Sequence, residues 1–162
     1  MKKIRLTGKY GTGQYALVDN EIFNWINQWQ WCVDKGYAVR GKSKKNGKQV
    51  SNIRMHRAIV ETYQSIDKSV YIDHINGNKL DNRKVNLRVV NQKQSAINRP
   101  IMSGSRVKYK GVTYEKMKYR ARIYPDGKAI SLGSYDTPEE AAEAYNRAAE
   151  QYYKQYARLN NI

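Results

Sequence analysis

The apolar residues in the first third of the chain recur with the short period of β-strands. Between residues 3 and 57, alternating runs such as IRLTGKYG, YALVD and GYAVR are separated by turn residues, which predicts a small strand-rich unit. Within it, residues 21–30 place Ile22, Trp25, Ile26 and Trp29 three to four positions apart and predict a short helix. We expect the three tryptophans of the chain to form the core of this unit rather than to stack on bases; they are Trp25, Trp29 and Trp31.

The middle of the chain predicts a helix followed by strand, loop, strand and helix. Residues 56–63, HRAIVETY, gather apolar side chains on one side of a helix. Residues 70–74 and 87–90 have the pattern of two short strands, with an Asn-Gly-Asn turn in the connection, and a further helix is expected from Asn91 onward. This succession is a compact scaffold on which side chains can hold a metal ion.

The last third of the chain predicts a separate module. Residues 99–107 mix Pro, Gly and Ser with basic residues and predict a linker. Three strand patterns and one helix pattern follow in residues 108–162, with a turn at Pro125-Asp126-Gly127 and a capping box made by Thr137 and Glu140. The predicted fold class is α+β: a strand-rich unit leading into the central scaffold in residues 1–98, then a three-stranded antiparallel sheet packed on one helix.

The net charge of the chain limits the classes of partner that it is expected to bind. The 162 residues include 30 Lys and Arg against 14 Asp and Glu, a formal net charge of +16. Such an excess is costly for a compact protein unless it meets a polyanion, and nucleic acid is the leading candidate. A membrane is not expected as a partner, because we find no long apolar run, no secretory signal and no basic amphipathic helix. We expect an intracellular, cytoplasmic protein of a phage or its bacterial host, not a secreted one.

Asp73 and His74 are the strongest candidates for chemistry. Hydrolysis of a phosphodiester needs a nucleophilic water and an offset for negative charge on the leaving oxygen, which a neutral imidazole and a hard cation can provide. Side chains of strand neighbours point to opposite faces, which suits His74 activating water while Asp73 binds metal. An amide such as that of Asn86 could fix the tautomer of the imidazole. The other interpretation is that an Asp-His pair is only a surface or capping feature.

A second metal ligand is expected from the helix that follows. Asn91, Ser95 and Asn98 fall on one face of that predicted helix by their spacing, so one of them could supply it. Oxygen ligands of this kind favour Mg²⁺ or Mn²⁺ over Zn²⁺.

These motifs resemble HNH endonucleases of the phage and intron-encoded homing type. The resemblance covers about the first two thirds of the chain and implies a ββα-metal nuclease domain, with His74 as general base, Asp73 as metal ligand and Asn86 as the residue that orients the histidine. Such enzymes commonly have Asn at the position of Ser95, so here Ser95, Asn98 or water completes the metal site. We expect Arg83, Arg88 and Arg99 to contact DNA, and His56 to be a structural histidine. The motifs are Met55-His56-Arg57, Asp73-His74, Asp81-Asn82-Arg83, Asn86-Leu87-Arg88 and Asn98-Arg99.

The segment KYRARIY predicts a two-sided strand in the last module. Tyr119, Ala121 and Ile123 suit a core face, while Arg120, Arg122 and Tyr124 project from the other side. Such a cationic face is either simply solvated or can enter a major groove of DNA. The inner face is expected to continue with Ile130, Leu132, Ala141, Ala144, Tyr145 and Ala148.

Residues 108–160 resemble a DNA-binding domain of the Apetala or ethylene-response-factor type. The resemblance rests on YKGV at 109–112, LGSYDT at 132–137, EEAA at 139–142 and Ala144-Tyr145. It implies that the three-stranded sheet faces the major groove. Three of the implied contact positions, Thr113, Ala129 and Ser131, often carry Arg or Trp in that family, so phosphate anchoring is expected more than base specificity. The implied contact residues are Lys110, Thr113, Arg120, Arg122, Tyr124, Ala129 and Ser131.

Two functions are consistent with these features. The first is a metal-dependent endonuclease that nicks or cleaves double-stranded DNA, with Mg²⁺ or Mn²⁺ as cofactor and no small-molecule substrate. The second is a non-catalytic DNA-binding protein that retains the HNH scaffold with a disabled metal site. RNA binding is less favoured, because no RNA-binding signature is present. No feature of the sequence selects an oligomeric state.

Overall fold

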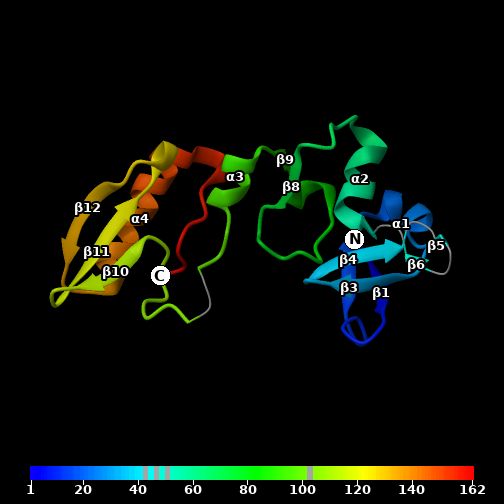
Figure 1. Ribbon diagram of the computed structural model, residues 1–162, viewed down its shortest axis with the longest axis horizontal. Coiled ribbons are helices and arrows are strands. Elements are labelled where there is room, and N and C mark those ends of the chain that lie inside the picture. Colours follow the sequence, from blue (N-terminus) through cyan, green and yellow to red (C-terminus); the bar gives the residue numbers. More distant parts are fainter. Residues whose placement is uncertain (42–43, 46–47, 50–51, 102–103) are drawn as a thin grey trace. The chain divides into compact units, whose positions relative to one another are not determined.

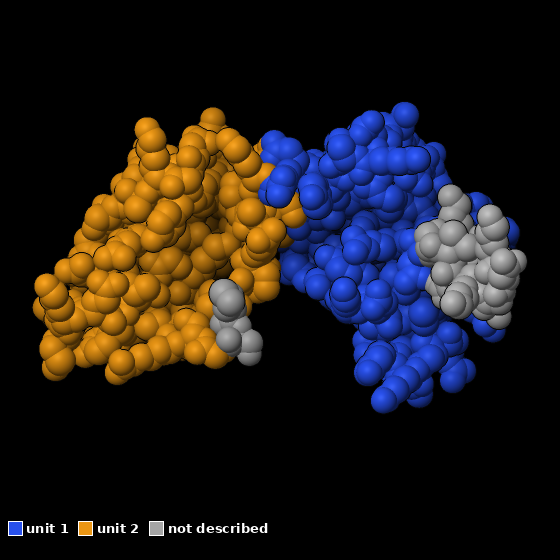
Figure 2. All heavy atoms as spheres, viewed as in Figure 1, with its two compact units in different colours: residues 1–92 blue, residues 93–162 orange. Residues whose placement is uncertain are grey.

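The computed structural model describes residues 1–41, 44–45, 48–49, 52–101 and 104–162, and the chain divides into two compact units, residues 1–92 and 93–162 (Figure 2). The division falls between Gln92 and Lys93, whereas the linker predicted from the sequence is residues 99–107. Residues 102 and 103 of that predicted linker lie outside the described residues.

A five-stranded sheet with strand order β2-β1-β3-β4-β7 is the scaffold of the first unit (Figure 1). β1 and β3 pair in parallel, and the other neighbours are antiparallel. The predicted strand-rich unit is confirmed, and β3 is a strand that the sequence pattern did not indicate. The strands are β1 (Lys2–Thr7), β2 (Tyr15–Val18), β3 (Trp31–Asp34), β4 (Tyr37–Gly41) and β7 (Asn52–Arg54), and a separate pair consists of β5 (Lys44–Lys45) and β6 (Lys48–Gln49).

The first helix, α1 (Asn20–Ile26), is shorter than the helix predicted over residues 21–30. The chain leaves the helix before Trp31, whose backbone pairs with Leu6 in the sheet. Its indole N–H donates to the carbonyl oxygen of Ile26 at 2.8 Å. That hydrogen bond satisfies one of the carbonyl groups that a helix end leaves without an intrahelical partner.

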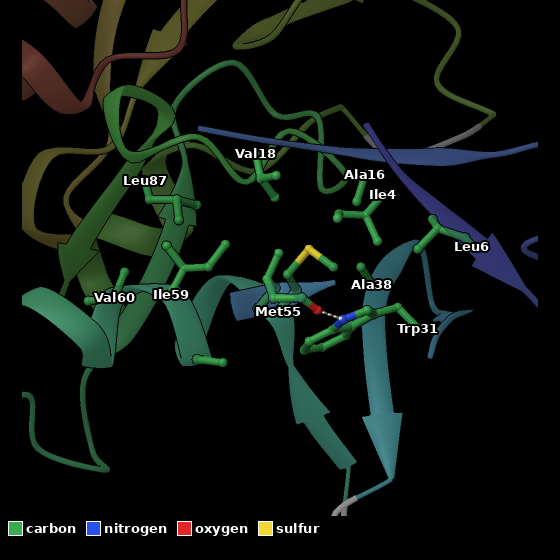
Figure 3. Close-up of a cluster of buried hydrophobic side chains, with 12 residues drawn as sticks. Ile4, Leu6, Ala16, Val18, Trp31, Ala38, Met55, Ile59, Val60 and Leu87 are labelled. Atoms are coloured by element: carbon green, nitrogen blue, oxygen red, sulfur yellow. Dashed lines mark hydrogen bonds between the residues drawn. The ribbon is translucent and has the colours of Figure 1, made fainter. Parts of the chain in front are cut away.

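Trp31 is part of the hydrophobic core of the first unit (Figure 3). The prediction that all three tryptophans form the core is right for Trp31, which is fully buried. Trp25 and Trp29 are half-buried and pack against the core, with their rings edge-to-face at a centroid distance of 5.0 Å. The other buried members are Ile4, Leu6, Ala16, Val18, Ile26, Ala38, Met55, Ala58, Ile59, Val60 and Leu87.

The helix α2 (Met55–Tyr63) and a hairpin complete the first unit. The hairpin pairs β8 (Tyr71–His74) with β9 (Leu87–Val90), so the predicted strand, loop and strand are confirmed. The loop between them ends in a 3₁₀ turn, Lys84–Asn86. Two backbone hydrogen bonds of 2.8 Å attach this loop to β2, one from the Leu17 N–H to the Leu80 carbonyl and one from the Asn82 N–H to the Leu17 carbonyl.

The second unit contains a three-stranded antiparallel sheet with order β10-β11-β12 and one long helix (Figure 1). This arrangement confirms the predicted C-terminal module, including the Pro125-Asp126-Gly127 turn between its second and third strands. Its elements are α3 (Gln92–Ile97), of which only Gln92 belongs to the first unit, β10 (Val112–Glu115), β11 (Lys118–Ile123), β12 (Ile130–Tyr135), α4 (Pro138–Tyr153) and the 3₁₀ turns Pro125–Gly127 and Lys154–Tyr156.

The start of α4 has the predicted capping box. The Thr137 hydroxyl accepts from the Glu140 N–H, and the Glu140 carboxylate accepts from the Thr137 N–H, both at 3.2 Å. This exchange satisfies two donors that would otherwise have no partner at a helix start. Neither α4 nor any other helix among the described residues is long and apolar enough to span a membrane.

α4 packs on one face of the sheet as its pattern predicted. Ala121 and Ile123 of β11 are buried together with Tyr145 of α4. Gly111 is required beside this helix, because its φ is +76° and a Cβ there would lie 2.1 Å from the Tyr145 ring. The buried helix residues are Ala141, Ala142, Ala144, Tyr145, Ala148 and Ala149.

Truncating a core side chain should destabilise the first unit selectively. Ile59 is 2 % exposed, so Ile59→Ala removes buried apolar atoms and should lower the free energy of unfolding by about 2–5 kcal/mol. All three tryptophans lie in the first unit, so denaturant unfolding followed by tryptophan fluorescence reports on that unit. Val85→Ala is the control, because Val85 is 76 % exposed and its loss should change stability little. Equal effects of the two substitutions would contradict this description of the core.

Candidate active site and nucleic-acid interface

Asp73 and His74 end the strand β8, and their side chains have different environments. The β8–β9 register sets Asp73 opposite Arg88 and His74 opposite Leu87. His74 is buried, whereas Asp73 is partly exposed. The division between a buried imidazole and a more accessible carboxylate is the one expected for strand neighbours that point to opposite faces.

The side chain of Asn82 fixes the imidazole of His74. The Asn82 Oδ1 atom lies 3.3 Å from Nε2 of His74, and the Asn82 Nδ2 group donates to the Leu80 carbonyl at 3.1 Å. That second bond determines which end of the amide faces the ring. Because Oδ1 can only accept, it selects the tautomer with a proton on Nε2, which leaves the lone pair of the neutral ring on Nδ1.

Asn86, which the sequence placed beside the imidazole, makes its hydrogen bonds to the loop backbone. Its Oδ1 atom accepts from the Asn76 N–H at 2.9 Å, and its Nδ2 group donates to the Asp81 carbonyl at 2.7 Å. The amide that the structure sets against the His74 ring is therefore that of Asn82. Both asparagines are buried in the same loop, and residue type alone does not tell which one faces the histidine.

Arg83, expected to contact DNA, is engaged by a buried carboxylate. Its Nε and Nη2 groups lie 2.7 and 2.6 Å from the two oxygens of Asp81, and Asn76 donates to the same carboxylate at 2.9 Å. The hydrogen bonds from Arg83 lower the pKa of Asp81 more than burial raises it. A buried carboxylate needs such a partner, so the first role of Arg83 is structural.

Asp73, the predicted metal ligand, pairs with Arg88 on the facing strand. The Nη2 and Nε groups of Arg88 lie 2.9 and 3.1 Å from Oδ2 of Asp73, and the two side chains are only 15 % and 14 % exposed. The described residues contain no cluster of three or more His, Cys, Asp or Glu side chains that could hold a metal ion. A single carboxylate still fits Mg²⁺, which is usually held by one or two carboxylates and keeps several waters. Arg88 and a cation would share the carboxylate of Asp73.

The predicted second ligands, Ser95 and Asn98, both belong to the second unit. Ser95 is half-buried on α3. Asn98 is buried and lies beyond the end of α3, so it does not continue the helical face that begins with Ser95. The Asn98 carbonyl accepts from Nη1 of Arg158 at 3.1 Å, a contact 60 residues apart in the sequence.

Lys110, another predicted DNA contact, also binds the end of α3. Its ammonium group donates to the carbonyl of Ile97, and to that of Arg99 at 2.8 Å. Burial, and secondarily the charge of Arg158, lowers the pKa of Lys110 to about 8. These bonds satisfy carbonyls left open at a helix end, so the structure gives Lys110 a role inside the unit.

A second histidine packs against His74. His56 is buried in α2, with its ring nearly perpendicular to that of His74 at 5.1 Å and 5.3 Å from the ring of Tyr37. Burial, followed by the charges of His74, Arg54 and Arg57, lowers the pKa of His56 to about 3. Burial also lowers the pKa of His74, against the opposing effects of Asn82, Asp73 and Asp81. Both rings are therefore neutral at neutral pH, the state that a general base requires.

On the sheet of the second unit, Arg120 and Arg122 share one carboxylate. Nη1 of Arg120 and Nη2 of Arg122 each lie 3.3 Å from Oε2 of Glu115. Lys118 pairs with Asp136 at the edge of the same sheet. The expected face is present, but its cations already have acidic partners that the sequence pattern did not single out. Arg99 and the other predicted contact positions, Thr113, Tyr124, Ala129 and Ser131, are exposed.

Comparisons with known proteins match both parts of the chain. Residues 54–96 match the model of an HNH endonuclease family, and residues 107–155 match the AP2 domain. The uncharacterized HNH endonuclease L560 of Acanthamoeba polyphaga mimivirus is 30 % identical over 154 residues, 94 % of this chain and 78 % of that protein. Protein 3.8 of Escherichia phage T7 is 32 % identical over 96 residues, 58 % of this chain and 78 % of that protein. A structure of the HNH homing endonuclease I-HmuI aligns over 76 % of this chain and 74 % of that chain, with 23 % identity and a TM-score of 0.35.

The burial of His56 should make the first unit less stable in acid. Because burial lowers the pKa of His56 from its usual 6.5 to about 3 in the folded chain, unfolding takes up a proton below pH 6.5. The contribution is fully present above pH 6.5 and is lost as the pH falls toward 3, by about 1.4 kcal/mol per pH unit. Tryptophan fluorescence in denaturant between pH 7 and 5 measures it. His56→Gln should have a shallower dependence by that amount, and parallel curves for the two proteins would contradict the burial of His56.

Proposed function

Because the chain belongs to the HNH endonuclease family, we propose that it is a metal-dependent endonuclease that hydrolyses phosphodiester bonds of duplex DNA. The observation that carries this proposal is the arrangement at the end of β8. There a buried neutral imidazole is held by Asn82 in one tautomer, and the carboxylate of Asp73 is its neighbour.

The residues of the first unit have distinct roles in this reaction. Nδ1 of His74 takes a proton from water, whose oxygen attacks phosphorus while the bond to the leaving oxygen breaks. Asn82 positions the ring by accepting from Nε2–H, and Asn86 holds the loop. Asp73 would hold Mg²⁺ or Mn²⁺, which when bound offsets negative charge on the phosphate and the leaving oxygen. By sequence, we assign the second protein ligand to Ser95 or Asn98, with water as the remaining candidate.

DNA is the partner that the charge and the AP2 domain support. The first unit carries 17 Lys and Arg against 7 Asp and Glu, and the second carries 13 against 7, so both units are cationic. We assign binding of the duplex in the second unit to the sheet face with Arg120 and Arg122, and retain Thr113, Tyr124 and Ser131 as neighbouring contacts. Lys110 is better assigned to the end of α3 than to DNA. Such a reaction belongs inside a cell, in keeping with the viral sources of the two relatives.

Two features favour a second candidate, a DNA-binding protein without nuclease activity. Arg88 occupies Oδ2 of the carboxylate that should bind metal, and Ser95 replaces the amide that homing-type enzymes commonly have. A hydroxyl is a shorter and poorer ligand than an amide oxygen. Both features would weaken metal binding while leaving DNA binding intact.

Nicking of supercoiled plasmid decides between these candidates. With Mg²⁺ or Mn²⁺ the wild-type protein should convert supercoiled plasmid to nicked or linear DNA, and EDTA should stop the reaction. His74→Ala and His74→Gln should lose at least about a hundredfold in rate, because the general base is removed. Asn82→Ala should lose roughly ten- to a hundredfold through the unfixed ring.

Asn24→Ala is the matched control for this assay, because Asn24 is an exposed asparagine of the same unit. Circular dichroism and tryptophan fluorescence establish that each variant is folded. Nicking that survives both His74 substitutions would rule out the proposed active site. Binding of plasmid without nicking by the wild-type protein would establish the second candidate.

Removing the two sheet arginines should weaken DNA binding and its salt dependence. Arg120→Gln with Arg122→Gln should reduce affinity for a duplex about tenfold or more, and flatten the slope of log affinity against log salt by about two. The control is Arg147→Gln with Lys154→Gln, which removes two exposed cations from the α4 region. Fluorescence anisotropy with a labelled 20-base-pair duplex measures both quantities. Equal losses in the two double variants would exclude a specific role for the sheet.

A further inference from the structure

Glu115 places a carboxylate within the proposed DNA-binding face. It lies on β10, where the register sets Thr113 opposite Arg120 on β11. The Thr113 hydroxyl donates to Oε1 of Glu115 at 3.2 Å, while the two arginines lie 3.3 Å from Oε2. Both oxygens of the Glu115 carboxylate therefore contact side chains that are expected to bind DNA. A purely phosphate-binding surface has no use for a negative charge at that position, because phosphate repels it.

The ion pairs of Glu115 contribute too little to the stability of the fold to explain why a carboxylate lies at this position. The side chain of Glu115 is 39 % exposed, and those of Arg120 and Arg122 are 36 % and 34 % exposed. Ion pairs with this degree of exposure contribute little to folding, because water and salt screen them. The pairs can therefore exchange when another polar partner arrives. Their effect is on selectivity: they determine which groups of a binding partner the two arginines bind.

The chemistry of this cluster matches base edges better than phosphates. In the major groove, an arginine binds O6 and N7 of guanine, and a carboxylate accepts from the N4 amino group of cytosine. A C·G pair presents both kinds of group, whereas the phosphate backbone presents only acceptors. An acidic side chain between two arginines can therefore gain a hydrogen bond from a cytosine but only repulsion from a phosphate.

We propose that Glu115 is a specificity-determining residue of this sheet: it accepts from a cytosine amino group in the major groove and penalises binding in which Arg120 and Arg122 contact phosphate alone. This inference rests on the proposed binding of duplex DNA by the same sheet. Glu115 then lowers affinity for arbitrary DNA and raises the difference between a preferred site and the rest. Specificity is such a difference, and a repulsive group that acts only against the wrong partner increases it.

The test compares Glu115→Gln with Glu143→Gln. Both remove one negative charge from the second unit, but Glu143 is an exposed residue of α4 that pairs with Arg147. The first probe is a 20-base-pair duplex of arbitrary sequence, measured by fluorescence anisotropy over a range of salt. Glu115→Gln should bind it about three- to tenfold more tightly than Glu143→Gln does, with a salt slope steeper by about one, because the released arginines can both reach phosphate.

The second probe is a pool of duplexes with a randomised centre, selected for binding by each protein. The wild type and Glu143→Gln should enrich a C·G pair at a fixed position, and Glu115→Gln should lose that preference. The inference is overturned if Glu115→Gln binds the arbitrary duplex no more tightly than Glu143→Gln does, or if it keeps the same enriched position. Failure of the proposed sheet binding is distinguishable, because the Arg120 and Arg122 double variant would then bind as the wild type does.

Discussion

A buried imidazole needs an acceptor for its N–H, and the acceptor for His74 determines how this part of the molecule is built. Asn82 can serve only if it is itself buried and oriented, and its second amide contact is the carbonyl of Leu80. Leu80 and Asn82 are in turn fixed by backbone hydrogen bonds to Leu17 of β2. The N-terminal sheet therefore supports the loop that positions the histidine, and the two form one compact unit. Without that sheet, only contacts within the loop itself would position the buried polar side chains.

The same loop shows why a strongly basic chain is not simply a surface of free cations. Arg83 balances the buried Asp81, and Arg88 balances the partly buried Asp73. Each arginine compensates the charge of a carboxylate whose removal from water would otherwise be unfavourable. Lys110 and Arg158 likewise serve carbonyl groups at the end of α3. Net charge alone therefore does not identify which arginines contact DNA.

Local patterns predicted the elements, and long-range contacts decided what the patterns left open. The capping box at Thr137, the paired strands β8 and β9, and the sheet packed on α4 follow from residue type and period, and the structure confirms them. The helix over residues 21–30 was predicted too long, and the period of its apolar residues does not indicate that Trp31 pairs with Leu6, far away in the sequence. The motif identified Asp73 and His74 as candidates, but the choice between Asn82 and Asn86 depends on the contact of the loop with β2. Asn98 does not continue the predicted helical face because α3 ends at Ile97, and the carbonyl groups at this end accept from Lys110 and Arg158.

Paired arginines change how affinity and selectivity arise on the sheet of the second unit. If Arg120 and Arg122 were unpaired, each phosphate contact would add attraction at any sequence, and binding would be strong but indiscriminate. Both arginines already lie beside Glu115, so contact with DNA exchanges the carboxylate for an acceptor on DNA. The binding free energy gained therefore depends on how well the DNA acceptor fits a guanidinium group. A guanine edge offers two acceptors in the geometry of a guanidinium group, whereas a displaced carboxylate beside a phosphate loses energy. An acidic residue that lowers total affinity can thus be what makes a small, shallow sheet selective.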